Sequence, residues 1–333
     1  MRKLLYWLDK YYYGGTDGHA YGLFRRHRYA FQSARMTARS GAPHTLHAGP
    51  LDLPFLWRPR GQCHYVFVDT TWRLWSAQAS FTRDCTPRLL RDAARAESMM
   101  YRQVEHIFAT SRYVRQDLMD HYGVPAGKVT VVGTGLGVIQ PFHGAKDYAN
   151  GKILFAAKGR FEDKGVPMVL AAFERARRRN PALQLTIVGQ EPGSLGISGL
   201  PNVTVPGFVP IEDLQRLFET HSLFLMPARN EPWGLVYLEA MACRMPIVGL
   251  NRNAFPEFTD GGKYGFGLDE ADPDTLARIM VEVFEQPARL ERMGAAAQAW
   301  CLEQYTWEKT VGRIVETIET LAKESPHGVR LPH

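Results

Sequence analysis

The sequence predicts an α/β protein made of two doubly wound domains that face a central cleft, and three observations lead to this fold class. Short apolar runs alternate with helical patterns along the whole chain, which is typical of parallel sheets covered by helices on both faces. The 333 residues suffice for two such domains. A polar segment with glycines and a proline, residues 141–152, separates two series of strands. We therefore expect an N-terminal domain over residues 1–145 and a C-terminal domain over residues 150–305.

In the first half, the expected strands are residues 3–8, 63–71, 106–111 and 128–133. The first of these, KLLYWL, is ended by Asp9 and is too short for a signal peptide, so it is interpreted as a buried strand. Helical spacing of apolar residues predicts helices over residues 87–105 and 112–123.

In the second half, the expected strands are residues 152–157, 183–189, 202–207, 223–228 and 246–250. The helices expected between them are residues 166–180, 211–222 and 234–244. Three further helices are expected over residues 272–286, 287–305 and 306–323. The last, about residues 306–325, has the length to cross back and pack on the first domain.

Composition is that of a globular protein, with 45% hydrophobic and 22% charged residues. No apolar run approaches the roughly 20 residues needed to cross a bilayer. The four cysteines are scattered, which excludes a close metal-binding or redox pair and favours the reducing cytoplasm.

Positive charge is concentrated in the first half. Residues 1–150 hold 20 Lys and Arg against 11 Asp and Glu, so the totals of 40 and 34 leave 20 against 23 for the remainder. Residues 19–39 mix five arginines with aromatic residues. This segment is interpreted either as a basic amphipathic helix at an anionic membrane surface or as a solvated helix whose aromatic side chains face the core. No nucleic-acid motif accompanies the charge.

Residues 227–249, PARNEPWGLVYLEAMACRMPIVG, carry the strongest chemical signal. A helix that begins near Gly234 directs the N–H groups of Gly234, Leu235 and Val236 toward a phosphate. Glu231 precedes this helix start and Glu239 follows it. A nucleotide sugar has its parts in the same order, with the sugar on one side of the diphosphate and the ribose on the other. The alternative is that Glu231 only favours the helix dipole and Glu239 faces solvent.

A second motif, ILFAAKGRFEDKGVPM, places Arg160 and Lys164 in a turn between a strand and a helix. Two fixed cations there would neutralise a departing diphosphate. Lys158 is a competing candidate, and a basic surface turn is the alternative. After a further strand, the turn at Phe208 and Val209 offers backbone groups to the edge of a base.

The Asp272-Pro273-Asp274 sequence is interpreted as a helix N-cap rather than a metal site. The cations in the Arg160–Lys164 turn make a metal unnecessary.

Together these motifs, with LTIVGQEPG, GFVPIEDLQRLF and FPEFTDG, resemble the donor domain of retaining family 4 glycosyltransferases (glycosyltransferase group 1) of the GT-B fold, over roughly residues 150–310. The resemblance implies that Arg160 and Lys164 bind the diphosphate and that Glu239 binds the ribose hydroxyls. It also implies that Glu231, Gly234 and Leu235 contact the sugar and phosphate. Two departures stand out: the Arg160–Lys164 spacing is one residue shorter than usual, and Arg244 stands where a glycine is common.

The first half resembles the family less closely. The pair Gly14–Gly15 is similar to the double glycine that follows the first strand and approaches the donor phosphate or the acceptor. Many members carry a histidine after a central strand, where this sequence has Asp69, Thr70 and Trp72. Asp69 would take the place of this histidine as a polar group, or would only cap a turn after the strand. Trp72 would shape an acceptor pocket.

The resemblance implies transfer of a hexose, with retention, from a UDP- or GDP-sugar to a hydroxyl of a glycan or glycolipid in cell-envelope polysaccharide or lipopolysaccharide synthesis. We expect a cytoplasmic enzyme, peripheral at the inner face of the membrane, that needs no cofactor and no metal. The alternatives are a nucleotide-sugar epimerase or hydrolase of the same fold, or a non-catalytic nucleotide-binding scaffold.

Overall fold

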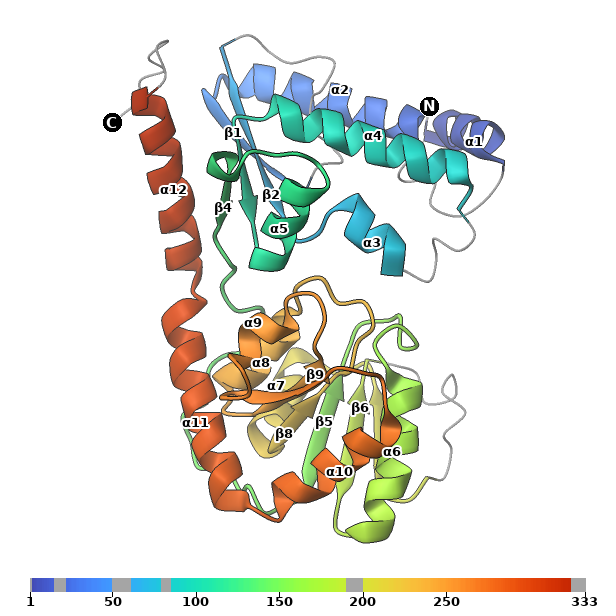
Figure 1. Cartoon of the computed structure of the whole chain (residues 1–333), viewed down its shortest axis with the longest axis vertical. Helices are drawn as coiled ribbons and strands as arrows, with labels where there is room; N and C mark the ends of the chain where they lie inside the picture. The colour runs from blue at the N-terminus through green and yellow to red at the C-terminus, as the bar shows by residue number, and fades with distance from the viewer. Residues whose placement is uncertain (1, 15–21, 50–60, 79–84, 190–199, 325–333) are drawn as a thin grey trace. The chain divides into compact units, whose positions relative to one another are not determined.

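The computed structural model describes residues 2–14, 22–49, 61–78, 85–189 and 200–324 (Figure 1). The chain forms two compact units: residues 1–133 together with 310–333, and residues 134–309. The division therefore falls before the polar segment 141–152, which belongs to the second unit.

The first unit contains α1 (Arg2–Tyr13), α2 (Leu23–Ser40), β1 (His44–Ala48), β2 (Cys63–Val68), α3 (Trp72–Gln78), α4 (Pro87–Gln103), β3 (His106–Ala109), α5 (Arg112–Asp120) and β4 (Val129–Val131). Most of α12 (Trp307–Glu324) also belongs to it. The four strands are parallel and lie in the order β1-β2-β3-β4.

Alternate residues of β2 and β3 enter different apolar clusters. Val66 and Ile107 pack in one cluster with residues of α2, α4 and α5. Tyr65 and Phe108 point to the other face, where they pack with Ile314 of α12. Because successive strand residues point to opposite faces, both faces of this sheet are covered by helices.

The second unit contains β5 (Lys152–Ala156), α6 (Val166–Arg179), β6 (Gln184–Val188), β7 (Val203–Gly207), α7 (Ile211–Thr220), β8 (Leu223–Leu225), α8 (Leu235–Ala242), β9 (Ile247–Leu250), α9 (Phe255–Thr259), β10 (Gly265–Leu268), α10 (Pro273–Phe284) and α11 (Pro287–Gln304). The parallel sheet has the order β10-β9-β8-β5-β6-β7. Strand order reverses between β5 and β8, so the loops after these strands flank the topological switch point, where open α/β sheets bind ligands.

The prediction of a first strand at residues 3–8 is wrong, because these residues lie in helix α1. A short apolar run does not distinguish strand from helix, and the pattern continues with helical spacing to the buried Tyr13. Asp9, also buried, accepts hydrogen bonds from the N–H groups of Phe24 (3.2 Å) and Arg25 (3.2 Å) and so caps the start of α2. A Cβ at Gly22 would lie 2.3 Å from the Asp9 carboxylate, so this contact requires a glycine.

Two strands were not predicted. β1, with the sequence HTLHA, carries two histidines, and β10, with the sequence GFGL, carries two glycines. Both are edge strands with weak apolar alternation, so they form because a neighbouring strand supplies hydrogen bonds and not because of their own propensity. The remaining predicted strands and helices are confirmed within a few residues at their ends.

Candidate active site

The loops after β5 and β8 build the candidate active site, and they are joined through their backbones. The Arg229 N–H donates to the Asp163 carbonyl at 2.8 Å. Gly165, with φ of 90°, begins α6, and a Cβ there would lie 2.4 Å from the Pro227 carbonyl oxygen. Only glycine allows this approach, so the two loops are held at van der Waals distance on either side of the switch point.

Lys164 and Glu231 meet across these joined loops. The Lys164 ammonium donates to Oε2 of Glu231, with side-chain exposures of 9% and 20%. Burial lowers the pKa of Lys164 to about 8, the positive charge of Arg160 acts in the same direction, and Asp163 opposes both. The Glu231 main chain is also held, since Asn253 Nδ2 donates to its carbonyl at 3.1 Å. Lys164, which is expected at the diphosphate, and Glu231, which is expected at the sugar and phosphate, thus form an ion pair.

Arg160 and Lys158 lie on the same loop as Lys164 and are both exposed. The loop turns at Arg160, whose φ is 50°, and the Arg160 carbonyl accepts from the Lys164 N–H at 2.9 Å. This turn orients the Lys164 backbone toward the β8 loop. Among the described residues, the pairing with Glu231 is made by Lys164 and not by the competing Lys158.

Helix α8 begins at the predicted place. Gly234 is its N-cap, with φ of 88°, and no side chain of the described residues accepts a hydrogen bond from the N–H groups of Leu235 or Val236. Trp233 anchors the turn, because it is buried, its Nε1 donates to Thr134 Oγ1 at 2.8 Å, and its ring packs edge-on against Phe258. Leu235 is exposed. An uncapped helix start of this kind offers N–H groups and positive dipole to an anion.

Glu239 is buried, which contradicts the alternative that it faces solvent. Its Oε1 accepts from the N–H groups of Val138 (2.7 Å) and Ile139 (3.2 Å), and a Cβ at Gly137 would lie 2.3 Å from the same oxygen. Burial raises its pKa, while these two hydrogen bonds oppose the shift. Oε2 has no hydrogen-bond partner in the part of the chain that the structure describes, so one carboxylate oxygen remains for a hydroxyl group.

Phe208 and Val209 follow β7 directly, at the carboxyl edge of the sheet. Phe208 is 64% exposed and Val209 is half-buried. The Gly207 carbonyl accepts from the Gly189 N–H at 2.9 Å, which ties this turn to the end of β6.

In the first unit, Gly14 follows helix α1 and not a strand, so that part of its predicted setting is wrong. Its Cβ position lies 3.7 Å from Thr86, the residue that caps α4. Gly15 lies outside the described residues. Asp69 is exposed at the end of β2. Trp72 is buried, with its Nε1 donating to the Leu90 carbonyl at 3.0 Å, so it packs inside its unit and does not line an open pocket.

Sequence reasoning missed a buried polar group beside Trp72. The Glu97 carboxylate accepts from the Trp72 N–H at 2.7 Å and from the Tyr122 hydroxyl. Burial raises its pKa to about 7, with Tyr122, Arg26 and the Trp72 N–H acting against the shift. Glu97 sits in the middle of a helical apolar pattern, and only its charge at a core position marked it out.

Helix α2 confirms a helix over most of residues 19–39 and contradicts, at two positions, the interpretation that its aromatic side chains face the core. Its buried stripe consists of Arg26, Ala30, Ala34 and Thr37, whereas Tyr29 and Phe31 are 40% and 45% exposed. The aromatic side chains at these two positions therefore do not face the core. Arg26 is not available at the surface, because its Nη1 donates to the Ala93 carbonyl at 3.4 Å.

Arg244, which departs from the family pattern, adopts the left-handed conformation with φ of 59° just after α8. Helices commonly have glycine at this position, just after their last turn, because glycine adopts the left-handed conformation easily. This explains why a glycine is common here in the family. Asp272 caps α10 as predicted, accepting from the N–H groups of Asp274 and Thr275.

The four cysteines are free thiols. Among the described residues, no three His, Cys, Asp or Glu side chains are grouped so as to hold a metal ion. No described helix is both long and apolar enough to cross a membrane.

Comparisons with known proteins agree with this architecture. The family model of glycosyl transferases group 1 matches residues 140–300, and that of glycosyltransferase family 4 matches residues 15–137. The GDP-mannose-dependent alpha-(1-6)-phosphatidylinositol monomannoside mannosyltransferase of Mycolicibacterium smegmatis is 30% identical over 171 residues, 46% of this chain and 44% of the relative. The chain spans about half the length of the curated relatives it matches.

Two solved structures share the fold at low sequence identity. The sucrose-phosphate synthase of Thermosynechococcus elongatus superimposes with a TM-score of 0.73 at 19% identity, covering 90% of this chain and 78% of that one. Anabaena HepE in complex with UDP and glucose gives a TM-score of 0.66 at 17% identity, covering 86% and 81%. With two Rossmann-like parallel sheets of the GT-B fold and family matches along both halves, the chain belongs to glycosyltransferase family 4, the glycosyl transferases group 1.

Proposed function

We propose that the protein is a glycosyltransferase that moves a hexose from a UDP- or GDP-sugar to a hydroxyl group of a glycan or glycolipid, with retention at the anomeric carbon. One observation carries the proposal: the Lys164–Glu231 pair lies on the loops that flank the switch point, and the β8 loop leads into the uncapped start of α8. Lys164 and Arg160 supply positive charge for a diphosphate, and Glu231 supplies an acceptor for sugar hydroxyls.

In this proposal the bond between the anomeric carbon and the diphosphate breaks while the acceptor oxygen approaches from the same face. The acceptor's proton passes to the leaving diphosphate, so no strong protein base is needed. Lys164, Arg160 and the N–H groups of Gly234 and Leu235 stabilise the charge that develops on the leaving group. Glu239 Oε2 accepts from a ribose hydroxyl, and the Phe208–Val209 turn contacts the base.

The ion pair has a consequence for binding. A diphosphate that reaches Lys164 has to compete with Glu231, or has to bring a sugar hydroxyl that Glu231 accepts in its place. We therefore propose that a nucleotide sugar is recognised as a whole, because the sugar occupies Glu231 while the diphosphate occupies Lys164.

A thermal-shift panel of UDP, GDP, ADP and dTDP tests the donor site. A ligand at 100 times its dissociation constant adds about 2.7 kcal/mol and raises the melting temperature by a few degrees. The variants Lys164→Ala and Glu231→Ala should lose turnover, and NMR of the product should show the donor's anomeric configuration. Absence of any shift with all four nucleotides would remove the basis of the donor site.

The alternatives are separated by turnover. Nucleotide release at equal rates with and without an acceptor would indicate hydrolysis or epimerisation, and no turnover with any donor would indicate a scaffold. We propose that no metal is required, because the cations at Arg160 and Lys164 take that role, and turnover should then survive EDTA. Loss of turnover in EDTA that returns with added Mg²⁺ would contradict this.

We propose a lipid-linked acceptor in cell-envelope polysaccharide or lipopolysaccharide synthesis and a position at the cytoplasmic face of the membrane. The M. smegmatis relative, named as a mannosyltransferase for a phosphatidylinositol monomannoside, supports a glycolipid acceptor. The surface of the first unit supports membrane contact: α2 exposes Tyr29, Phe31 and Arg35, and α1 packs against α2.

Helix α1 adds an apolar stripe, with Leu4, Trp7 and Tyr11 at 61%, 66% and 82% exposure. These positions share one face of a helix, and aromatic residues favour the membrane interface. Sedimentation with vesicles of phosphatidylglycerol and phosphatidylcholine should carry the protein down, and the double variant Trp7→Ser/Tyr11→Ser should stay in solution. Equal sedimentation of both proteins would contradict membrane contact.

A further inference from the structure

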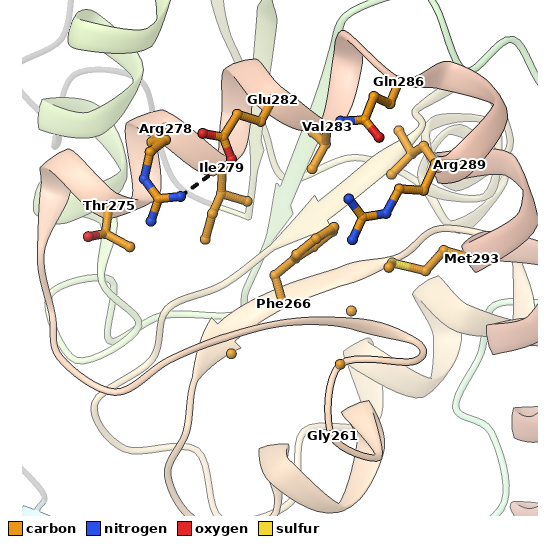
Figure 2. A pocket seen from close by; sticks show the side chains of 14 residues that line it. Gly261, Phe266, Thr275, Arg278, Ile279, Glu282, Val283, Gln286, Arg289 and Met293 are labelled. Atoms are coloured by element: carbon orange, nitrogen blue, oxygen red, sulfur yellow. Dashed lines mark hydrogen bonds and ion pairs between the residues drawn. The ribbon is translucent and has the colours of Figure 1, made fainter.

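A groove in the second unit lies apart from the candidate active site. It has a volume of about 550 Å³ and is bounded by β10, the turn before it, α10 and the start of α11 (Figure 2). β10 is the edge strand of the six-stranded sheet, separated from β5 by β9 and β8. None of the residues assigned to the donor site lines this groove, and its volume is within the range of small-molecule sites.

The floor of the groove is apolar. Its side chains are Phe266, Ile279, Val283, Leu290 and Met293. Val283, Leu290 and Met293 are buried, and the other two are half-buried. An apolar floor that the chain itself leaves partly uncovered favours a ligand with an apolar body.

The mouth of the groove carries one uncompensated positive charge. Arg278 is an exposed partner of Glu282, at 3.4 Å and one helical turn away. Arg289 makes no side-chain hydrogen bond or ion pair with any residue that the structure describes, and Figure 2 shows its guanidinium turned toward Phe266. A guanidinium over an apolar floor suits a carboxylate, sulfonate or phosphate, which it binds with paired hydrogen bonds.

The edge strand adds bare backbone to the same groove. The carbonyl of Tyr264 accepts from the N–H of Ile247 in β9 at 3.5 Å, and the carbonyl of Leu268 accepts from the N–H of Asn251, just after β9, at 2.8 Å. Since residues alternate along a parallel strand, the polar groups of Gly267 point away from β9, at the free edge. Gly267 is exposed and lines the groove, and a Cβ there would lie 1.8 Å from Asn251 Oδ1, so a side chain at this position would require Asn251 to move.

We propose that this groove binds a small amphipathic anion, an aromatic ring system or short acyl chain that carries a single anionic group. The apolar body lies on Phe266 and Ile279, and the anionic group meets Arg289. The site is independent of the donor site and of the reaction assigned to it.

Two matched dyes test the proposal with the full chain. 8-Anilinonaphthalene-1-sulfonate is an aromatic monoanion, and N-phenyl-1-naphthylamine is the same ring system without the sulfonate. We expect saturable fluorescence with one site per chain, and tighter binding of the sulfonate than of the neutral dye. Arg289→Gln should weaken the sulfonate about tenfold, the size of a lost charge-assisted contact, and leave the neutral dye unchanged.

The control is Arg292→Gln, which removes an exposed arginine from the next turn of α11 outside the groove lining and should leave both affinities unchanged. Ile279→Trp, which fills the groove, should abolish binding of both dyes without lowering the cooperativity of unfolding. Equal weakening by Arg289→Gln and Arg292→Gln would overturn the proposal, since it would indicate surface charge alone. Displacement of the dye by UDP or GDP, or binding that does not saturate, would overturn it too.

Discussion

The Lys164–Glu231 pair gives the sharpest quantitative prediction, because it is both the centre of the proposed site and a buried ion pair. We consider the four proteins of a double-mutant cycle: the wild type, Lys164→Met, Glu231→Gln and the variant with both changes. Each replacement nearly preserves side-chain volume and removes one charge. The cycle therefore measures the interaction and not the packing.

The magnitude follows from the burial of the two groups. Two charges about 4 Å apart at an effective dielectric constant of about 20 interact by roughly 4 kcal/mol. Desolvation offsets part of this, and a fifth of the Glu231 side chain still faces solvent. We expect each single variant to lower the free energy of unfolding by about 2 kcal/mol, because it leaves one buried charge without its partner, and the double variant by about 1 kcal/mol, so the coupling is about 3 kcal/mol.

The pH dependence supplies an internal check. The pKa of Lys164 is about 8 in the folded chain against 10.5 for a free lysine, so the unfolded chain binds the extra proton between these values. Stability attributable to this group therefore rises from pH 8 to pH 10.5, and Lys164→Met should lack that rise. The coupling, which needs the charged ammonium, should be present at pH 7 and smaller at pH 9.5.

Urea denaturation of the four proteins at both pH values measures all these quantities. Single effects that add up to the double effect within about 0.5 kcal/mol at pH 7 would show that the pair does not form in solution. The proposed exchange of Glu231 for a diphosphate would then have no basis.

Three further predictions concern the buried and strained groups around the sites. Burial raises the pKa of Glu97 from 4.5 to about 7, so between these pH values the folded chain keeps a proton that the unfolded chain releases. The free energy of unfolding should therefore fall by up to about 3 kcal/mol from pH 4.5 to pH 7. Glu97→Gln should remove this fall when the free energy is measured by urea denaturation, and an unchanged slope would refute the pKa shift. Arg244→Gly should raise the free energy of unfolding by about 1 kcal/mol, because glycine adopts the left-handed conformation without strain; a lower melting temperature would mean that the arginine side chain contributes more than its backbone strain costs. Asp9→Ala should lower the free energy of unfolding by about 1–2 kcal/mol, because the start of α2 loses its cap. Chemical denaturation that shows no change would argue against Asp9 as the cap of α2.

Much of the second unit was predictable because its sequence carries complete local signals. The strands of residues 152–157 and 223–228 are short apolar runs followed by turn residues, and Gly234 marks the start of α8 by its own conformational freedom. Strand and helix boundaries there depend on periodicity and on caps, as at Asp272, which act within a few residues.

The first unit was harder to predict for a physical reason. KLLYWL satisfies strand and helix patterns equally, and its state is decided by packing against α2 and by the carboxylate of Asp9 at the α2 start. Likewise, Trp72 resembles an exposed pocket residue after a strand, but its indole is buried and bonded to the Leu90 carbonyl. Neither contact leaves a trace in the neighbouring sequence.

Local spacing was enough to predict the two doubly wound halves, the helix start at Gly234 and the residue types of the proposed donor site. Two contacts depend on the packing of distant segments: Lys164 and Glu231, 67 residues apart, form an ion pair, and one carboxylate oxygen of Glu239 accepts hydrogen bonds from the backbone at residues 138 and 139. Such pairings depend on strand order, and strand order is set by the burial of whole strands and helices against one another. The fold therefore decides which distant group pairs with a charged side chain, and the residues next to that side chain in the sequence do not.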